Sequence, residues 1–211
     1  MIQSIKTTSG QYFFHPIQLF HGRKTIVRDV ARENLIATHE LLSQTEVRWG
    51  IIFGTLLGAV RESDFIEHDE DTDIFVLAED KQMLLALIPD FKRLGFEIAR
   101  YEGGLFSIIR SDEYIDFYFL AKKFGGRRAG NLFVPKAFLS HFDTIVMFDL
   151  TFPTVNGPIK FLEYTYGPDW AIPLVGAHAE GNPPRWKNLV KLFVPQWIMA
   201  LRTKRRPSGR P

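Results

Sequence analysis

The 211-residue sequence predicts an α/β (α+β) domain in which helices flank a mixed β-sheet. One observation is an amphipathic helical segment followed by short apolar stretches that have the length and composition of buried strands. The other is a further amphipathic helical segment, after which three strand-like stretches follow in close succession. This order of elements favours a sheet with both parallel and antiparallel neighbours.

The first half of the chain is predicted to hold three helical segments and two buried strands. The helices are expected over residues 26–47, 55–61 and 79–95, and the strands over residues 48–54 and 73–78. Thr55 is the expected N-cap of the second helical segment. The third helix is expected to end at Gly95, and Pro89 predicts a kink or a break inside it.

Three further strands and a less regular region are predicted in the second half of the chain. The strands are expected over residues 96–102, 105–110 and 114–121, with turns at Gly103-Gly104 and Ser111-Asp112. The region beyond is predicted to contain a glycine-flanked loop over 125–131, a hairpin over 151–159, and a short helix over 161–170 that ends at Gly167 and Pro168.

The composition is that of a globular protein without disulfides. The chain is 45% hydrophobic with 19 phenylalanines, which is enough for a sizeable core. It has no cysteine, so disulfides and thiolate metal sites are excluded. The first residues lack the layout of a signal peptide, and no run approaches the roughly 18 apolar residues of a membrane-spanning helix. We therefore expect a cytoplasmic protein.

The net charge of +2 combines a basic tail with an acidic body. The last ten residues hold five basic residues and no acid, which leaves 21 basic and 24 acidic residues elsewhere. An acidic body argues against a nucleic-acid-binding protein. An apolar stretch over residues 189–201 precedes the tail, a layout typical of proteins that rest on an anionic membrane. We expect peripheral contact with the inner face of the cell membrane; the alternative is that this stretch packs on the domain.

Four acids are crowded ahead of the second predicted strand, in "HDEDTD" over residues 68–73. Asp71 and Asp73 are two positions apart where the chain enters a strand, so both can point to the same face. Asp116 is the lone acid of the strand-like stretch "YIDFYFL". If these strands are neighbours, three carboxylates converge, and Mg²⁺ or Mn²⁺ would neutralise them and polarise a phosphoryl group.

Two simpler explanations of the acids account for less of the sequence. The spacing of the acids matches the start of a calcium-binding EF-hand loop, but Ile74 and Asp80 stand where that loop needs glycine and glutamate. A solvated acidic turn accounts neither for Asp116 nor for the nearby Gly54 and Thr55. These two residues, at a predicted helix N-terminus, are expected to bind a phosphate through backbone N–H groups.

The stretch "WGIIFGTLLGAVRESDFIEHDEDTDIFV" resembles the signature of the LicD/fukutin-type phosphotransferases, a branch of the nucleotidyltransferase superfamily. Members typically read G-T-L-L-G-A-V-R, a short spacer with F-I, and then W-D-D-D-I-D. The chain keeps the first block, the F-I pair and three of the acids, but departs with His68, Glu70 and Thr72. "YIDFYFL" and "FLEYTYGPDWAIP" are similar to later family motifs, so the resemblance covers roughly residues 30–175.

The resemblance implies a nucleotidyltransferase-like fold and a reaction. The catalytic domain would cover residues 26–180, between an N-terminal extension (1–25) and a C-terminal amphipathic segment with the basic tail (181–211). A phosphorylated alcohol, such as phosphocholine or a polyol phosphate, would move from a CDP-activated donor to a hydroxyl of a cell-surface glycan, which a lipid can carry. CMP would leave. The alternatives are transfer of the nucleotide itself to a protein, small molecule or RNA, and a non-catalytic metal- or nucleotide-binding module.

By matched position, Asp71, Asp73 and Asp116 are the expected catalytic residues and metal ligands, with Asp116 as a third ligand or the general base. Arg61 is expected to steady the phosphates or the acidic loop. Outside these roles, the residues assigned to substrate binding are Gly54, Thr55, Asp69, Arg127, Arg128 and Asp169. For the arginine pair, a solvated loop is the alternative.

Overall fold

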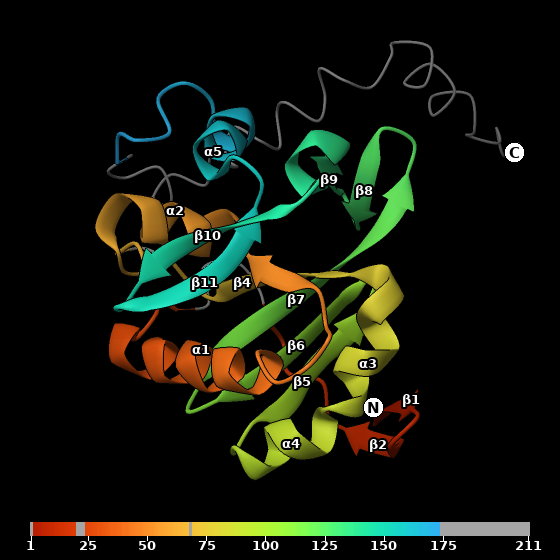
Figure 1. Cartoon of the computed structure of the whole chain (residues 1–211). Helices are drawn as coiled ribbons and strands as arrows, with labels where there is room; N and C mark the ends of the chain where they lie inside the picture. The colour runs from red at the N-terminus through yellow and green to blue at the C-terminus, as the bar shows by residue number, and fades with distance from the viewer. Residues whose placement is uncertain (1, 20–23, 68, 174–211) are drawn as a thin grey trace, which may run out of the picture. The chain divides into compact units, whose positions relative to one another are not determined.

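The computed structural model describes residues 2–19, 24–67 and 69–173, and the chain divides into two compact units, residues 1–161 and 162–211. Figure 1 shows the elements along the chain. The helices are α1 (Arg28–Leu42), α2 (Phe53–Glu62), α3 (Lys81–Ala86), α4 (Ile88–Arg93) and α5 (Pro158–Tyr166), with short 3-10 turns η1 (Ala78–Asp80) and η2 (Lys136–Leu139). The strands are β1 (Gln3–Thr7), β2 (Gly10–Phe14), β3 (Trp49–Ile51), β4 (Thr72–Leu77), β5 (Glu97–Glu102), β6 (Leu105–Arg110), β7 (Glu113–Lys123), β8 (Gly126–Ala129), β9 (Leu132–Pro135), β10 (Phe142–Met147) and β11 (Leu150–Val155).

A mixed sheet organises the first unit. Seven strands follow one another across it in the order β10, β11, β3, β4, β7, β6 and β5, and β8 and β9 continue from the end of β7 (Figure 1). β4 lies parallel to β7, and β11 parallel to β3, whereas the remaining pairs of the sheet are antiparallel. The predicted mixed sheet flanked by helices is confirmed.

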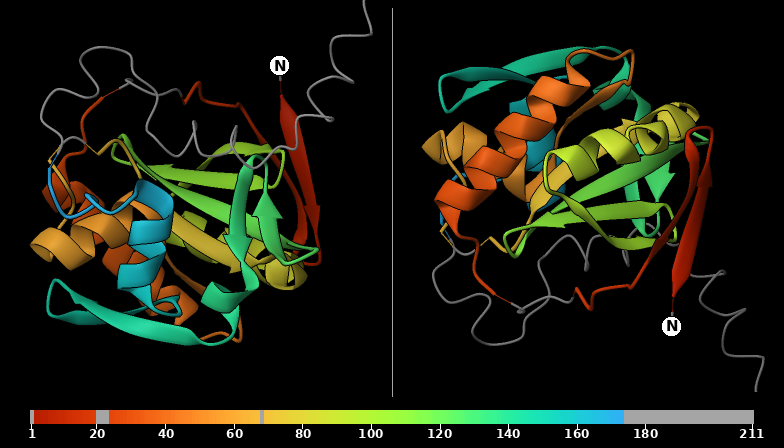
Figure 2. Two further views of the ribbon diagram at one scale, coloured as in Figure 1. Left: turned by 90° about the horizontal axis from the view of Figure 1, so that it is seen from above. Right: turned by 90° about the horizontal axis from the view of Figure 1, so that it is seen from below.

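The helices α1, α3 and α4 cover one face of this sheet (Figure 2). The main apolar cluster joins their buried side chains, among them Leu35, Leu84 and Phe91, to residues of the central strands such as Ile74 and Phe117. Successive residues of a strand point to opposite faces. Because Ile74 faces the helices, Asp73, which precedes it, faces the other side of the sheet, and so does Asp116, which is paired with Asp73.

The predicted helices are present, with two changes. The first runs over Arg28–Leu42, and the 79–95 segment is divided into η1, α3 and α4, so the break lies at Leu87, two residues before Pro89. Gly95 has the expected left-handed conformation, with φ of 86°. The N-cap prediction for Thr55 is wrong. The helix α2 begins at Phe53, and the Thr55 side chain is fully buried inside its first turn.

Two predictions in the second half of the chain are also wrong. Residues 125–131 are not a loop, because 126–129 form the strand β8, which pairs with both β7 and β9. The hairpin predicted over 151–159 instead joins β10 to β11, and its turn lies at Phe148 and Asp149, both of which have positive φ. The helix predicted over 161–170 begins at Pro158 and, as expected, stops before Gly167.

The N-terminal residues contribute to the core. β1 and β2 form an antiparallel hairpin, and Ile5 and Phe14 belong to the main apolar cluster. The chain then runs beside the edge strand β5, where the Ile17 N–H donates to the Ala99 carbonyl at 2.9 Å. Within the described part of the chain, no helix combines the length and the apolar character needed to cross a membrane. The C-terminal segment and tail predicted over 181–211 lie outside the described residues.

Candidate active site

A row of four polar side chains crosses the face of the sheet that is opposite α1, α3 and α4. Asp73 of β4 lies opposite Asp116 of β7, Asp116 lies opposite Ser107 of β6, and Ser107 lies opposite Arg100 of the edge strand β5. Residues in register on neighbouring strands share a face, so these side chains are adjacent. The expected convergence of Asp73 and Asp116 is present in the structure.

Asp116 is held by the two polar residues beside it. An Arg100 Nη2–H donates to Asp116 Oδ2 at 2.7 Å, and the Ser107 hydroxyl donates to Asp116 Oδ1 at 2.5 Å. The Arg100 Nε–H donates to the Ser107 oxygen at 3.1 Å, which closes the triad. Asp116 is 3% exposed, so the guanidinium supplies the charge partner that a buried carboxylate requires.

Asp73 is held by the N-terminal turn of α2. The Gly54 N–H donates to Asp73 Oδ2 at 3.0 Å, and the Asp73 N–H donates to the Thr55 hydroxyl oxygen at 2.8 Å. The N-terminus of a helix favours a negative charge. In the structure the Gly54 N–H and the Thr55 hydroxyl bind Asp73, and the phosphate contact expected of these two residues stays a prediction.

A glycine is required at position 54 because two carboxylates approach its backbone. A Cβ there would lie 2.9 Å from Asp69 Oδ2 and 3.2 Å from Asp73 Oδ2. Real Cβ atoms are essentially never closer than 3.0 Å to a neighbour. The glycine of the G-T block thus allows the acidic segment to pack on the start of α2.

Asp69 and Asp71 complete the acidic group, which we define as Asp69, Asp71, Asp73 and Asp116. The Asp69 carbonyl accepts from the Ile26 N–H at 2.8 Å, which fixes the segment that carries these acids. The Asp69 Oδ1 accepts from the Glu70 N–H at 3.2 Å, whereas its Oδ2 is inaccessible to solvent and has no hydrogen-bond partner among the described residues. A buried carboxylate oxygen without a partner is costly and is a position for a ligand.

The acidic group repels itself in the absence of a cation. Burial, together with the Asp73 and Asp116 charges, raises the pKa of Asp71 well above its ordinary value. Burial and the same kind of repulsion raise the pKa of Asp69 and of Asp73, although the hydrogen bond from the Gly54 N–H acts against this at Asp73. Burial also raises the pKa of Asp116, and the hydrogen bonds from Arg100 and Ser107 oppose the rise. The Arg100 guanidinium alone therefore does not balance the four carboxylates of the acidic group.

The acidic group fits a divalent cation in its chemistry. Carboxylate oxygens are the ligands that Mg²⁺ prefers, and Asp69 Oδ2 lacks a hydrogen-bond partner in the described structure. Among the described residues, no three acidic or histidine side chains stand in a ready arrangement for a metal ion. One physical reason is that both oxygens of Asp116 are already hydrogen-bonded, to Arg100 and to Ser107.

Residues 46–164, from just before β3 into α5, match the family described as LicD/FKTN/FKRP, nucleotidyltransferase domain. This match covers more than half of the chain. The chain belongs to the LicD/FKTN/FKRP family. The family identified from the G-T-L-L-G-A-V-R block is thereby confirmed, and membership supports a transferase with a nucleotidyltransferase domain.

Relatives of this LicD-family chain are similar over part of their length or in fold alone. An uncharacterized protein of Rickettsia typhi (strain Wilmington) is 44% identical over 61 residues, which are 29% of this chain and 20% of that protein. The chain thus matches about a fifth of that relative. The solution structure of the antibiotic-resistance factor ANT(2'')-Ia has a TM-score of 0.51 at 12% identity, over 82% of this chain and 97% of that one, which shows a common fold. A putative nucleotidyltransferase of Thermotoga maritima has a TM-score of 0.45 at 14% identity, over 87% and 97%.

The remaining residues assigned to the substrate lie elsewhere in the LicD-family chain. Arg61 is in the last turn of α2, about 10 Å along the helix from Gly54, and forms an ion pair with Glu62 at 3.6 Å. Asp169 lies in the second unit, where its carbonyl accepts from the Ile172 N–H at 2.9 Å. A substrate contact for Asp169 stays a prediction.

The arginine pair of β8 is separated from the acidic group. Arg128 is exposed and pairs with Ala121, five residues and about 16 Å along β7 from Asp116. Arg127 donates to Glu79 Oε2 at 2.7 Å and to the Leu120 carbonyl at 3.0 Å. The Arg127 contacts join β8 to η1 and to β7, which is a structural role.

Three residues beside the acids were not recognised from the sequence. Arg100 and Ser107 bind Asp116, and the Tyr118 hydroxyl forms a hydrogen bond with Asp73. A signal was present for one of them: Ser107 is a single polar residue in the apolar run Leu105–Ile109, as Asp116 is in its own strand, whereas Arg100 shares its strand with Glu97 and Glu102. Only the strand order and register show that these three lie side by side.

Proposed function

We propose that this LicD-family protein transfers a phosphorylated alcohol from a CDP-activated donor to a hydroxyl of a glycan acceptor, and that it requires Mg²⁺ or Mn²⁺. The observation that carries the proposal is the placement of Asp73 and Asp116 in direct register on β4 and β7, with Asp71 and Asp69 beside them. A group of neighbouring carboxylates can bind a cation, and in enzymes of phosphoryl transfer this cation also binds phosphate oxygens of the substrate.

Asp71, Asp73 and Asp116 would hold the cation in this proposal. When bound, it would neutralise the acids and withdraw charge from the diphosphate of the donor. The start of α2 fixes Asp73 through Gly54 and Thr55, so one ligand is oriented before any substrate arrives. Orientation of this kind is the main contribution that a protein makes to phosphoryl transfer.

The reaction itself is a displacement at the phosphorus atom that bears the alcohol. The acceptor oxygen forms a bond to this phosphorus, and the bond from phosphorus to the bridging oxygen of the CDP group breaks. The proton of the acceptor hydroxyl passes to a carboxylate of the acidic group, and the leaving group is CMP. The product is a phosphodiester between the alcohol and the glycan.

A two-label assay tests this reaction. The protein is incubated with Mg²⁺, a glycan acceptor, and CDP-choline labelled either in choline or in cytidine; ATP labelled in the α-phosphate is the comparison. We expect choline label on the glycan, cytidine label in CMP, and no transfer from ATP. Label from ATP on the acceptor would indicate nucleotidyl transfer instead. Donor binding without turnover would indicate a non-catalytic module.

A further inference from the structure

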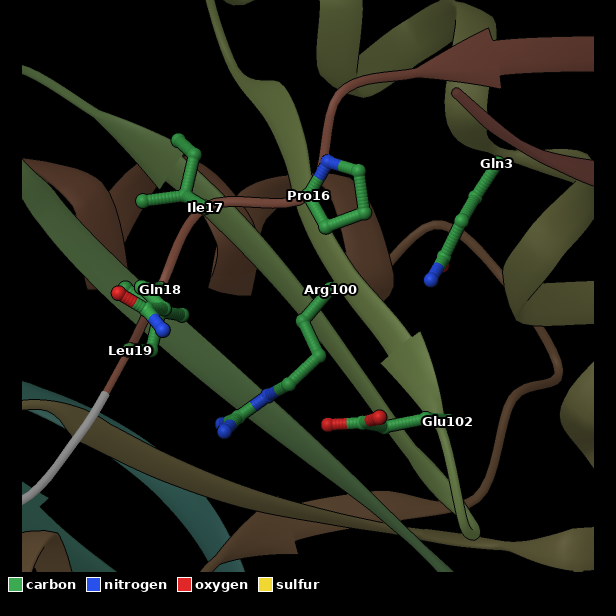
Figure 3. A pocket seen from close by; sticks show the side chains of 7 residues that line it. All are labelled: Gln3, Pro16, Ile17, Gln18, Leu19, Arg100 and Glu102. Atoms are coloured by element: carbon green, nitrogen blue, oxygen red, sulfur yellow. The ribbon is translucent and has the colours of Figure 1, made fainter. Parts of the chain in front are cut away.

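Arg100 lies between the acidic group and a surface cavity. The cavity has a volume of about 210 Å³ and is bounded by the edge strand β5 and the segment that precedes α1 (Figure 3). Its lining residues are Gln3, Pro16, Ile17, Gln18, Leu19, Arg100 and Glu102. The Arg100 side chain is 19% exposed, while its Nη2 bonds to a carboxylate that is 4% exposed. Arg100 therefore has both a buried partner and open space beside it.

A divalent cation and the Arg100 guanidinium need the same carboxylate. Arg100 Nη2 is 2.7 Å from Asp116 Oδ2. A metal ion bound to that oxygen would therefore lie close to the positively charged guanidinium of Arg100. Two like charges a few ångströms apart in a buried setting repel strongly. The two cations thus compete for Asp116.

The cavity offers the guanidinium a second acceptor. Glu102 lies two residues after Arg100 on the same strand, about 7 Å along it, so both side chains leave β5 on the same side. Figure 3 shows the two side chains extending into the same space. The four-bond side chain of arginine can reach such a neighbour by rotamer changes alone.

We propose that Arg100 is a resident counter-cation of Asp116, and that a divalent metal displaces its guanidinium into the cavity beside Glu102. This inference rests on the proposed metal site. Without metal, Arg100 neutralises Asp116 and stabilises the strands β5, β6 and β7 across the row. With metal, Asp116 becomes a ligand and Arg100 exchanges one carboxylate for another.

The test is the affinity of the full chain for Mg²⁺ and Mn²⁺, measured by calorimetric titration without substrate. Coupling between two competing groups is usually at least about fivefold, so Arg100→Gln should bind metal about fivefold more tightly than the wild type, or better. Arg100→Lys keeps the competing charge and should remain within about twofold of the wild type. Glu102→Gln removes the negative charge of the second acceptor and should weaken metal binding, whereas Asp116→Asn should weaken it most.

Other results of the titration would overturn either the competition between Arg100 and the metal or the metal site itself. Weaker or unchanged binding by Arg100→Gln, with binding by the wild type, overturns the competition and leaves the proposed function intact. Absence of binding by both proteins overturns the metal site together with this inference. If Arg100→Gln does not fold, the arginine Nε–H resonance of Arg100 in the wild type decides: we expect it to shift as metal saturates, and an unshifted resonance contradicts displacement.

Discussion

Asp73 and Asp116 lie directly opposite each other on the parallel strands β4 and β7, yet they are held by groups of different charge. Asp116 is ion-paired with Arg100, whereas Asp73 is bound by the Gly54 N–H and a tyrosine hydroxyl. These neutral partners do not supply a positive charge to compensate that of Asp73 at the start of α2. Removing the charge of Asp116, which has a cationic partner, should therefore change the stability of the protein differently from removing the charge of another acid of the group.

Asp71→Asn and Asp116→Asn should both abolish transfer but change the melting temperature in opposite directions. Without metal, Asp71→Asn relieves repulsion within the acidic group, and we expect a gain on the order of 1 kcal/mol. Asp116→Asn leaves the Arg100 guanidinium without its anion, and we expect a loss on the order of 3 kcal/mol. Thermal unfolding in EDTA measures both. A stabilised Asp116→Asn would contradict the assigned ion pair.

Gly54→Ala should reduce transfer on the order of 100-fold while the protein remains folded. The added Cβ would lie 2.9 Å from Asp69 Oδ2 and 3.2 Å from Asp73 Oδ2, so both carboxylates must move. Gly103→Ala is the control for a Cβ that contacts nothing: its Cβ would meet no atom within 4 Å, so its only cost is the backbone strain of alanine at a φ of 56°. Initial rates at saturating donor give the answer. Equal activity in the two variants would show that the close packing of Asp69 and Asp73 on the Gly54 backbone is not needed for transfer.

Gly58→Ala should destabilise the protein, against the usual effect of this substitution in a helix. Alanine normally stabilises an exposed helix by about 1 kcal/mol relative to glycine. Here the Cβ would lie 2.3 Å from the Asp64 carbonyl oxygen, and we expect a loss of about 1–3 kcal/mol. Urea unfolding measures the sign. A more stable variant would mean that residues 64–66 do not cross α2 as closely as the structure shows.

The ion pair between Asp80 and Arg48 should make stability depend on pH in the acid range. A hydrogen bond from Arg48 lowers the pKa of Asp80, so the stabilisation is complete above the unfolded pKa of about 3.9 and is lost as pH falls through the folded pKa. Arg48 is half-exposed, so the effect should be no more than about 1 kcal/mol. Asp80→Asn should be less stable than the wild type at pH 7, and the difference should shrink as the pH falls below the unfolded pKa. A constant difference would exclude the ion pair.

Hydrophobic patterns predicted the sheet and its helices because each element buries one regular face. They located β4 to β7, and the turns that join β5 to β6 and β6 to β7, within one or two residues. The misplaced elements are those without such a face: β8 is exposed in part and reads as a polar loop, and the turn at Phe148 and Asp149 contains no glycine. Thr55 was taken for a cap because local sequence does not reveal that its hydroxyl accepts from the Asp73 N–H.

The candidate site was predictable only in part, because local sequence reveals the acids but not the contacts between strands that are distant in the sequence. The acids could be found since carboxylates beside an apolar strand are unusual, and the family block reinforced them. Arg100 is 16 residues from Asp116 in sequence, and its contact depends on the order β7, β6, β5 and on the register of both pairs. The arginines of β8 were named as weaker candidates because they lie in a glycine-flanked stretch, and that position in the sequence carries no information about their distance from Asp116.

The most direct test of the central claim is a crystal structure of the protein grown with Mn²⁺ and CMP, with anomalous diffraction recorded for manganese. We predict a manganese peak within coordination distance of carboxylate oxygens of Asp71, Asp73 and Asp116, with a phosphate oxygen of CMP as a further ligand. A peak that avoids these three side chains, or CMP bound with no manganese at the acidic group, would contradict the proposed metal-dependent transfer.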